Sequence, residues 1–281
     1  MKFNQTKSSM KPKLFFFSLM VLTVTLFSCK QGSKDDETKI LFLHHSTGGV
    51  IWQGASSNSK RGDLPVLFAK YNKENQTNYL ITRQKFPKGN PYGWNNYPFD
   101  YYNIWVKNAG DEAFMEEPTL EILTKTNDVI IFKHCFPVSN IQEDSDFSDI
   151  NSDLKTLGNY KMQYEALKVK LQQFADTKFI LWTGAVQVKS AITEKEALRT
   201  KEFFRWVIEE WDQPDDNIYI WDFYHLEAEG DLYLKDEYAV SSSDSHPNQE
   251  FAGRVVNLLF NRVIDVIENS GQGTTLTGQP K

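Results

Sequence analysis

The stretch Ile40-Leu41-Phe42-Leu43-His44-His45-Ser46-Thr47-Gly48-Gly49 joins an apolar run directly to a glycine-containing turn. An apolar run without alternating polar residues is typical of a strand that is buried on both faces, as in a parallel sheet. Open parallel sheets bind their ligands at the carboxyl ends of the strands, which is where this stretch places Ser46. The junction therefore predicts both a sheet strand and a candidate functional residue.

Four more apolar runs follow, and amphipathic patterns lie between them. Three of these patterns repeat apolar residues at steps of three and four, which indicates helices that face a core. This alternation predicts one doubly wound, three-layer α/β domain over residues 38–268, with a parallel sheet of about five strands. We expect residues 269–281 to form a loose tail. The other strand runs span 79–82, 128–132, 178–182 and 217–221, and the helical patterns span 160–174, 198–211 and 252–267.

The charge balance of the chain is acidic. Its 281 residues include 31 lysines and arginines against 37 aspartates and glutamates, which gives a formal net charge of −6. Residues 1–28 carry four lysines and no acidic residue, so their removal changes the net charge to −10. This balance argues against a nucleic-acid partner and favours a neutral ligand over a polyanion.

Residues 1–28 begin with lysines and continue with an apolar run, the arrangement of a secretory signal. Leu26-Phe27-Ser28-Cys29 resembles a bacterial lipobox, which implies that Cys29 is lipidated and becomes the new N-terminus. Residues 29–37 are polar and suit a tether. We therefore expect a protein of the cell envelope, anchored by lipid in the outer or cytoplasmic membrane and periplasmic or surface-exposed. An ordinary secretory signal with an incidental cysteine is the alternative.

Two polar blocks at opposite ends of the domain supply candidates for acyl transfer. Ser46 follows the first strand, and Asp244-Ser245-His246-Pro247-Asn248 precedes the last helical pattern. A nucleophilic serine needs an exposed hydroxyl, a nearby base and free N–H groups for an oxyanion. The chain order Ser46, Asp244, His246 suits nucleophile, orienting acid and general base. For the local motif alone, a serine in an ordinary turn is the alternative.

The pairing of an N-terminal strand serine with a D-x-H-P-N block resembles the SGNH/GDSL hydrolase family, as a divergent branch, over about residues 38–268. The resemblance implies a flavodoxin-like fold, with Ser46 as nucleophile and His246 as base. Two departures stand out, since the motif reads His-His-Ser instead of Gly-Asp-Ser and the acid lies two residues before the histidine instead of three. Asp222, after the fifth strand, is therefore an alternative to Asp244.

The resemblance also implies an oxyanion hole made by the Ser46 N–H, a glycine after the second strand and an asparagine after the third. Gly93 is the glycine candidate, with Gly89 as the other available glycine. Asn140 is the asparagine candidate, and Lys133 or Ser139 are its alternatives.

Four of the five histidines, His44, His45, His134 and His246, fall at predicted strand ends or loops on one edge of the sheet. A metal site is one interpretation of that set. The usual ligand spacings are absent and carboxylates are not interleaved, so we expect no metal and no cofactor. We expect His45 and His134 to line a substrate pocket instead. Cys135 suits a small buried hydrophobe better than a thiol nucleophile.

Seven aromatic residues lie among the fourteen positions from Tyr92 to Trp105. Such rings stack well on sugar faces, which makes Trp94 and Trp105 candidate substrate-binding residues. A satellite core that fastens a long loop is the alternative. Taken together, the features predict a serine esterase that removes acyl groups, O-acetyl above all, from carbohydrate or another small ester. The alternative is a catalytically inactive glycan-binding lipoprotein with the same fold.

Overall fold

The computed structural model describes residues 1–3, 37–56, 61–93, 95–145 and 147–281. The expected lipidation at Cys29, Trp94, and nearly all of the expected signal and tether lie outside the described residues. The chain divides into two units, Met1–Ser33 and Lys34–Lys281, and nearly all of the first lies outside the described residues. The second unit holds every strand and helix of the described residues, and none of these helices is long and apolar enough to cross a membrane.

One parallel sheet contains five strands in the order β2 (Tyr79–Lys85), β1 (Thr38–His44), β3 (Val129–Lys133), β4 (Lys178–Trp182) and β5 (Ile218–Trp221). The predicted α/β architecture is confirmed, and the strand order is that of flavodoxin-like folds. In register, Phe42 lies between Arg83 of β2 and Ile131 of β3. A separate antiparallel hairpin consists of β6 (Ala239–Ser241) and β7 (Asp244–Pro247).

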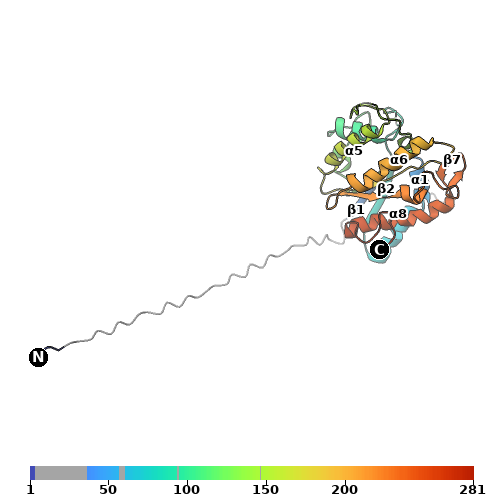
Figure 1. Cartoon of the computed structure of the whole chain (residues 1–281). Coiled ribbons are helices and arrows are strands. Elements are labelled where there is room, and N and C mark those ends of the chain that lie inside the picture. Colours follow the sequence, from blue (N-terminus) through green and yellow to red (C-terminus); the bar gives the residue numbers. More distant parts are fainter. Residues whose placement is uncertain (4–36, 57–60, 94, 146) are drawn as a thin grey trace. The chain divides into compact units, whose positions relative to one another are not determined.

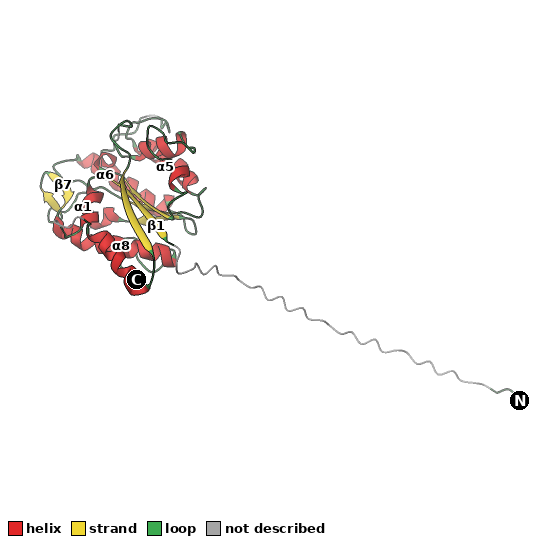
Figure 2. Ribbon diagram, turned by 180° about the vertical axis from the view of Figure 1, so that it is seen from behind, coloured by secondary structure: helices red, strands yellow, loops and turns green. Residues whose placement is uncertain are grey.

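Helices cover both faces of the sheet, so the domain has three layers (Figures 1 and 2). One face packs against α1 (Thr47–Gln53), α2 (Asp63–Asn75) and α8 (Gln249–Asn269). The opposite face packs against α3 (Pro98–Tyr102), α5 (Leu157–Leu171) and α6 (Glu194–Trp206). The shorter elements are α4 (Leu120–Leu123), α7 (Phe223–Ala228), the π-helical turns η1 (Asn103–Lys107) and η3 (Val207–Trp211), and the 3₁₀ turn η2 (Phe136–Ser139).

Alternating side chains of the strands build two cores. In β1, Ile40 and Phe42 belong to the core under α8, whereas Leu41 and Leu43 belong to the core under α5 and α6. All four are at most 6% exposed. Because both faces of the sheet are covered, neither set of side chains reaches solvent, which explains why the apolar run does not alternate with polar residues.

The C-terminal segment is bonded to the domain, which corrects the expectation of a loose tail over residues 269–281. The Trp221 indole N–H donates to the carbonyl of Thr277 at 3.1 Å. The backbone N–H of Asp222 donates to the carbonyl of Leu276 at 2.9 Å. Composition missed this attachment because the tail contributes mainly backbone carbonyls, and their pairing leaves no signal in residue types.

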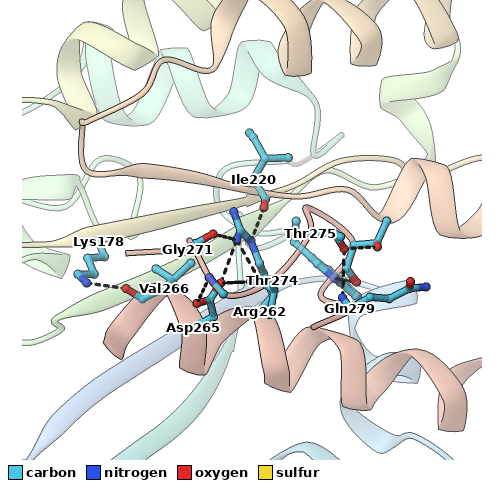
Figure 3. A network of polar contacts seen from close by, with 12 residues as sticks. Lys178, Ile220, Arg262, Asp265, Val266, Gly271, Thr274, Thr275 and Gln279 are labelled. Atoms are coloured by element: carbon cyan, nitrogen blue, oxygen red, sulfur yellow. Dashed lines mark hydrogen bonds and ion pairs between the residues drawn. The ribbon is translucent and has the colours of Figure 1, made fainter. Parts of the chain in front are cut away.

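A buried charged pair in α8 completes the attachment (Figure 3). Arg262 is 4% exposed and donates to the carbonyls of Ile220 at 2.9 Å and Gly271 at 2.8 Å. Asp265, one turn later, accepts the backbone N–H and the hydroxyl of Thr274 at 2.8 and 2.6 Å. The two side chains lie 3.4 Å apart, so each offsets the cost of burying the other.

Replacing Asp265 should strongly destabilise the domain, because Asp265→Ala leaves the buried Arg262 guanidinium without its carboxylate. We expect the free energy of unfolding to fall by about 3–5 kcal/mol in urea titrations followed by circular dichroism. Asp111→Ala is the matched control, since Asp111 pairs with Lys125 in an exposed position. Equal urea midpoints for the two variants would show that the Arg262–Asp265 network does not stabilise the domain.

Candidate active site

The turn between β1 and α1 holds Ser46 at the carboxyl edge of the sheet. The residue has φ 40° and ψ −107°, a conformation that L-residues rarely adopt and that costs roughly 1–3 kcal/mol. Its side chain is exposed, whereas Thr47 and Gly48 are buried. The chain therefore passes sharply from strand to helix and leaves the serine hydroxyl at the surface.

Gly48 allows α1 to lie directly against the end of β1. A Cβ atom at this position would lie 2.6 Å from Cβ of His44 and 3.1 Å from Cδ of Lys133. Both distances are well below the roughly 3.5–4.0 Å of ordinary carbon contacts. Only glycine fits this turn without displacement of its neighbours.

Ser46, His246 and Asp244 form one hydrogen-bonded chain. The Ser46 hydroxyl donates to Nε2 of His246, and Nδ1 of His246 donates to Oδ1 of Asp244 at 2.6 Å. The carboxylate on the Nδ1 side assigns the imidazole proton to that nitrogen. Asp244 also accepts the backbone N–H of His246 at 3.0 Å, and these two hydrogen bonds hold the pKa of Asp244 below its ordinary value. An ionised carboxylate thus faces the imidazole.

The two-residue offset between Asp244 and His246 follows from their place in β7. Residues i and i+2 of a strand point to the same side, so both side chains are half-exposed on one face. Ser245 points to the other face, where its hydroxyl accepts the Val188 N–H at 3.0 Å. In this strand an offset of two residues brings the carboxylate and the imidazole together, whereas the SGNH pattern has an offset of three.

Asp222, the alternative acid, is occupied elsewhere. Its Oδ1 accepts the Thr183 hydroxyl at 2.9 Å and the backbone N–H of His225 at 3.2 Å, which caps α7. Burial raises the pKa of this carboxyl. Asp222 also lines a cavity of about 740 Å³ beside α7 and α8 whose lining includes none of Ser46, Asp244 and His246.

Of the backbone N–H groups in this turn, only that of the candidate nucleophile Ser46 belongs to an exposed residue, because Thr47 is 0% exposed. In the part of the chain that the structure describes, neither the N–H of Ser46 nor that of Thr47 donates a hydrogen bond. The expected contribution of Gly93 is wrong, because its N–H donates to the carbonyl of Gly89 at 2.7 Å. Asn140 ends η2, a turn whose Phe136 ring packs edge-on against His246 at 5.2 Å, and it stays a candidate.

The two alternatives to Asn140 do not reach the surface. Ser139 is buried and donates to the carbonyl of Ala185. Lys133 is 0% exposed. Neither side chain is placed to touch a substrate at Ser46.

Two expected pocket residues belong to the core. His134 is fully buried on the α5 side of the sheet, where its Nε2 contacts the Tyr164 hydroxyl. Trp105 is fully buried against Phe86 and Phe132. The expected substrate contacts of both are therefore wrong, and the satellite-core interpretation holds for Trp105. The other described rings of that segment, Tyr92, Tyr97, Phe99, Tyr101 and Tyr102, are buried or packed on the same core.

The remaining histidines do not gather at one point. His45 is 7% exposed, and its Nε2 donates to the carbonyl of Pro87 at 2.5 Å, which ties the loop after β2 to the nucleophile turn. His44 packs under α1, on the face of the sheet opposite to His134. Among the residues described, no three His, Cys, Asp or Glu side chains are placed to share a metal ion. Cys135 is buried, as a small hydrophobe would be.

Two buried ionisable side chains lie behind the turn that holds Ser46, and the sequence did not predict that they are neighbours. Lys133 at the end of β3 and Glu227 in α7 are both 0% exposed. Glu227 accepts the Val186 N–H at 2.9 Å, yet burial raises its pKa to about 8. Burial lowers the pKa of Lys133, and it lowers that of the adjacent His44 to about 3. Lys133 could have been noticed as a lysine at the end of an apolar strand. Glu227 lies far from it in the sequence, so no pattern indicated that the two side chains are close.

The raised pKa of Glu227 predicts a pH-dependent stability. The carboxyl of Glu227 binds its proton more tightly in the folded state than in the unfolded chain, where its pKa has the ordinary value of 4.5. The contribution of Glu227 to the free energy of unfolding therefore falls as pH rises from about 4.5 to about 8. Glu227→Gln keeps the acceptor for Val186 but does not titrate. The charged and titratable neighbours Lys133 and Tyr224 are the same in both proteins.

We therefore expect Glu227→Gln to gain stability relative to wild type between pH 5 and pH 8.5, measured as urea midpoints. Comparing the two proteins at each pH cancels the other titrating groups. A constant difference between them would show that Glu227 has an ordinary pKa.

Comparison with known proteins yields no relative: no protein-family model, no curated protein and no solved structure matches the chain. The resemblance to SGNH hydrolases therefore depends on the residues themselves. The geometry of Ser46, Asp244 and His246 is the basis for a function.

Proposed function

We propose that this chain is a serine esterase of the SGNH type. One observation carries the proposal: the Ser46 hydroxyl, the His246 imidazole and the Asp244 carboxylate form a continuous hydrogen-bonded chain at the carboxyl edge of a parallel sheet. Serine acyl transfer needs this combination of nucleophile, base and orienting acid. The strained turn that exposes Ser46 supports the same conclusion, because such turns present nucleophiles in α/β hydrolases.

The residues act in a defined order in this proposal. Nε2 of His246 takes the proton of Ser46 while Oγ forms a bond to the ester carbonyl carbon, and Asp244 stabilises the resulting imidazolium. The carbonyl oxygen becomes negative and accepts a hydrogen bond from the N–H group of Ser46, with Asn140 as the candidate second donor. The imidazolium then protonates the departing alcohol. A water molecule, deprotonated by His246, releases the acid and restores Ser46.

Acylated carbohydrate is the substrate class that we propose, with O-acetyl as the acyl group. The side chains of His246 and Asp244 are 36% and 45% exposed, so an ester on a bulky glycan reaches Ser46 without entering a deep pocket. The aromatic segment no longer supports this choice, since its described rings lie in the core. The cell-envelope address supports it through the lipid expected on Cys29.

Substitution of the three residues tests the proposal with acetyl esters of a chromogenic alcohol and of xylose. Ser46→Ala and His246→Ala should each lower kcat by about 10⁴-fold or more, since each removes a member of one unit. Asp244→Asn should lower kcat less than either. Ser243→Ala and His225→Ala change the same residue types outside this hydrogen-bonded chain and should keep wild-type activity. If wild type is no faster than the two alanine variants across several acyl esters, the chain is not an esterase and the inactive glycan-binding alternative applies.

The membrane anchor has a separate test. Wild type expressed with labelled palmitate should incorporate label and sediment with membranes, whereas Cys29→Ala should do neither. Label in both proteins, or in neither, contradicts the proposed lipidation.

A further inference from the structure

The turn η2 places an aromatic ring against the candidate general base. Phe136 packs on His246 with the ring centres 5.2 Å apart and the ring planes at 87°. Edge-to-face contacts at this separation are a favourable arrangement of two aromatic rings. Among the rings that the structure describes, Phe136 is the one that packs against His246. This phenyl ring therefore borders the group that exchanges protons with the substrate.

The backbone around Phe136 is held from three sides. The Cys135 N–H donates to the carbonyl of Asn96, in the loop after β2, at 3.0 Å. The Ser139 hydroxyl donates to the carbonyl of Ala185, in the loop after β4. The Ser139 carbonyl accepts the hydroxyl of Thr200, in α6, at 2.7 Å. The ring is thus fixed before a ligand arrives, which avoids a cost of ordering it on binding.

The Phe136 ring remains partly open to solvent. Val138 and Ser139 of the same turn are 0% exposed, whereas Phe136 is half-buried. Because the anchored turn cannot fold the ring away, part of its apolar surface stays in water beside the base. Covering such surface with an apolar part of a ligand is favourable.

Proton transfer brings the departing alcohol close to this ring. In the proposed reaction the alcohol oxygen takes a proton from Nε2 of His246, so the two atoms lie about 3 Å apart. The Phe136 ring centre lies 5.2 Å from the centre of the same imidazole. A methyl or ethyl group on that oxygen is too short to cover the phenyl ring. A sugar ring on the same oxygen is large enough to reach it.

We propose that Phe136 is a specificity-determining residue that forms an apolar wall beside His246, against which the sugar ring of the departing alcohol packs. Aromatic rings suit the apolar C–H face of a sugar. The sugar hydroxyls stay in water, because the side chains of His246 and Asp244 are 36% and 45% exposed. The inference rests on the proposed esterase function and specifies the alcohol part of its substrate.

Hydrolysis of acetylated xylose, ethyl acetate and ethyl butyrate by the full chain tests this wall. Phe136→Ala should lower the ratio of kcat/KM for acetylated xylose to that for ethyl acetate by about 10-fold. Most of this change should lie in KM, since the contact is made equally in the ground state and the transition state. The ratio of ethyl butyrate to ethyl acetate should stay that of wild type. A ring that only supports the imidazole would change all three rates by the same factor.

Two control variants accompany Phe136→Ala. Phe136→Tyr keeps the aromatic ring and should keep the wild-type ratios. Phe260→Ala removes a half-buried ring from α8 that packs on Phe68 and Tyr71. This variant should also keep both ratios, so that loss of a half-buried phenyl ring in general is separated from loss of the wall.

The outcomes separate the two proposals. Unchanged ratios in Phe136→Ala overturn the wall and leave the esterase intact. A changed ratio of butyrate to acetate would place the ring at the acyl group and overturns the wall as well. A wild type no faster than Ser46→Ala on all three esters overturns the esterase and this inference with it. If Phe136→Ala does not fold, Phe136→Leu keeps apolar volume without the flat face, and its ratio of xylose ester to ethyl acetate should fall in the same direction.

Discussion

The close approach of α1 to the carboxyl end of β1 is the constraint on which the candidate site depends. No side chain fits at Gly48, because His44 and Lys133 occupy the space that its Cβ would need. This contact forces the chain to turn within one residue, and Ser46 takes up the turn with a positive φ. The hydroxyl is thereby fixed at the surface, and the N–H of Ser46 has no acceptor among the residues that the structure describes. The strain of one residue is held by the packing of its neighbours.

The sequence was sufficient wherever the deciding contacts are local. The apolar runs of β1 and β3 became strands because each needs only its own residues to be buried on both faces, whereas β2 lies at the sheet edge and is largely exposed. Ser46 was found because it follows a strand at the carboxyl edge of the sheet, and Asp244 and His246 because their block precedes the last helix, although they lie in the separate β6–β7 hairpin. The offset of two between Asp244 and His246 counted against the pair until the segment proved to be a strand. In a strand, that offset is the one that aligns the side chains.

The predictions of site residues were wrong where the result depends on the face of the sheet to which a side chain points. His134 follows Lys133 directly, and alternation sends one to the α5 side and the other beneath α1. Its place at a predicted strand end therefore grouped His134 with the site, although its ring lies on the α5 side of the sheet. Trp105 and Gly93 failed for a related reason, since composition shows that a loop is rich in rings or glycine but not which atoms it turns inward.

Net charge is a poor guide to the charge that a substrate meets here. The chain is acidic as a whole, yet Arg83 and Lys85 lie on the edge strand beside β1, in register with Phe42 and His44. Lys133 lies beneath the same strand ends, where burial lowers its pKa. Potential at a site depends on nearby and poorly screened charges, whereas distant surface carboxylates are screened within about 10 Å. Net charge therefore carries little weight for the charge of a ligand at Ser46.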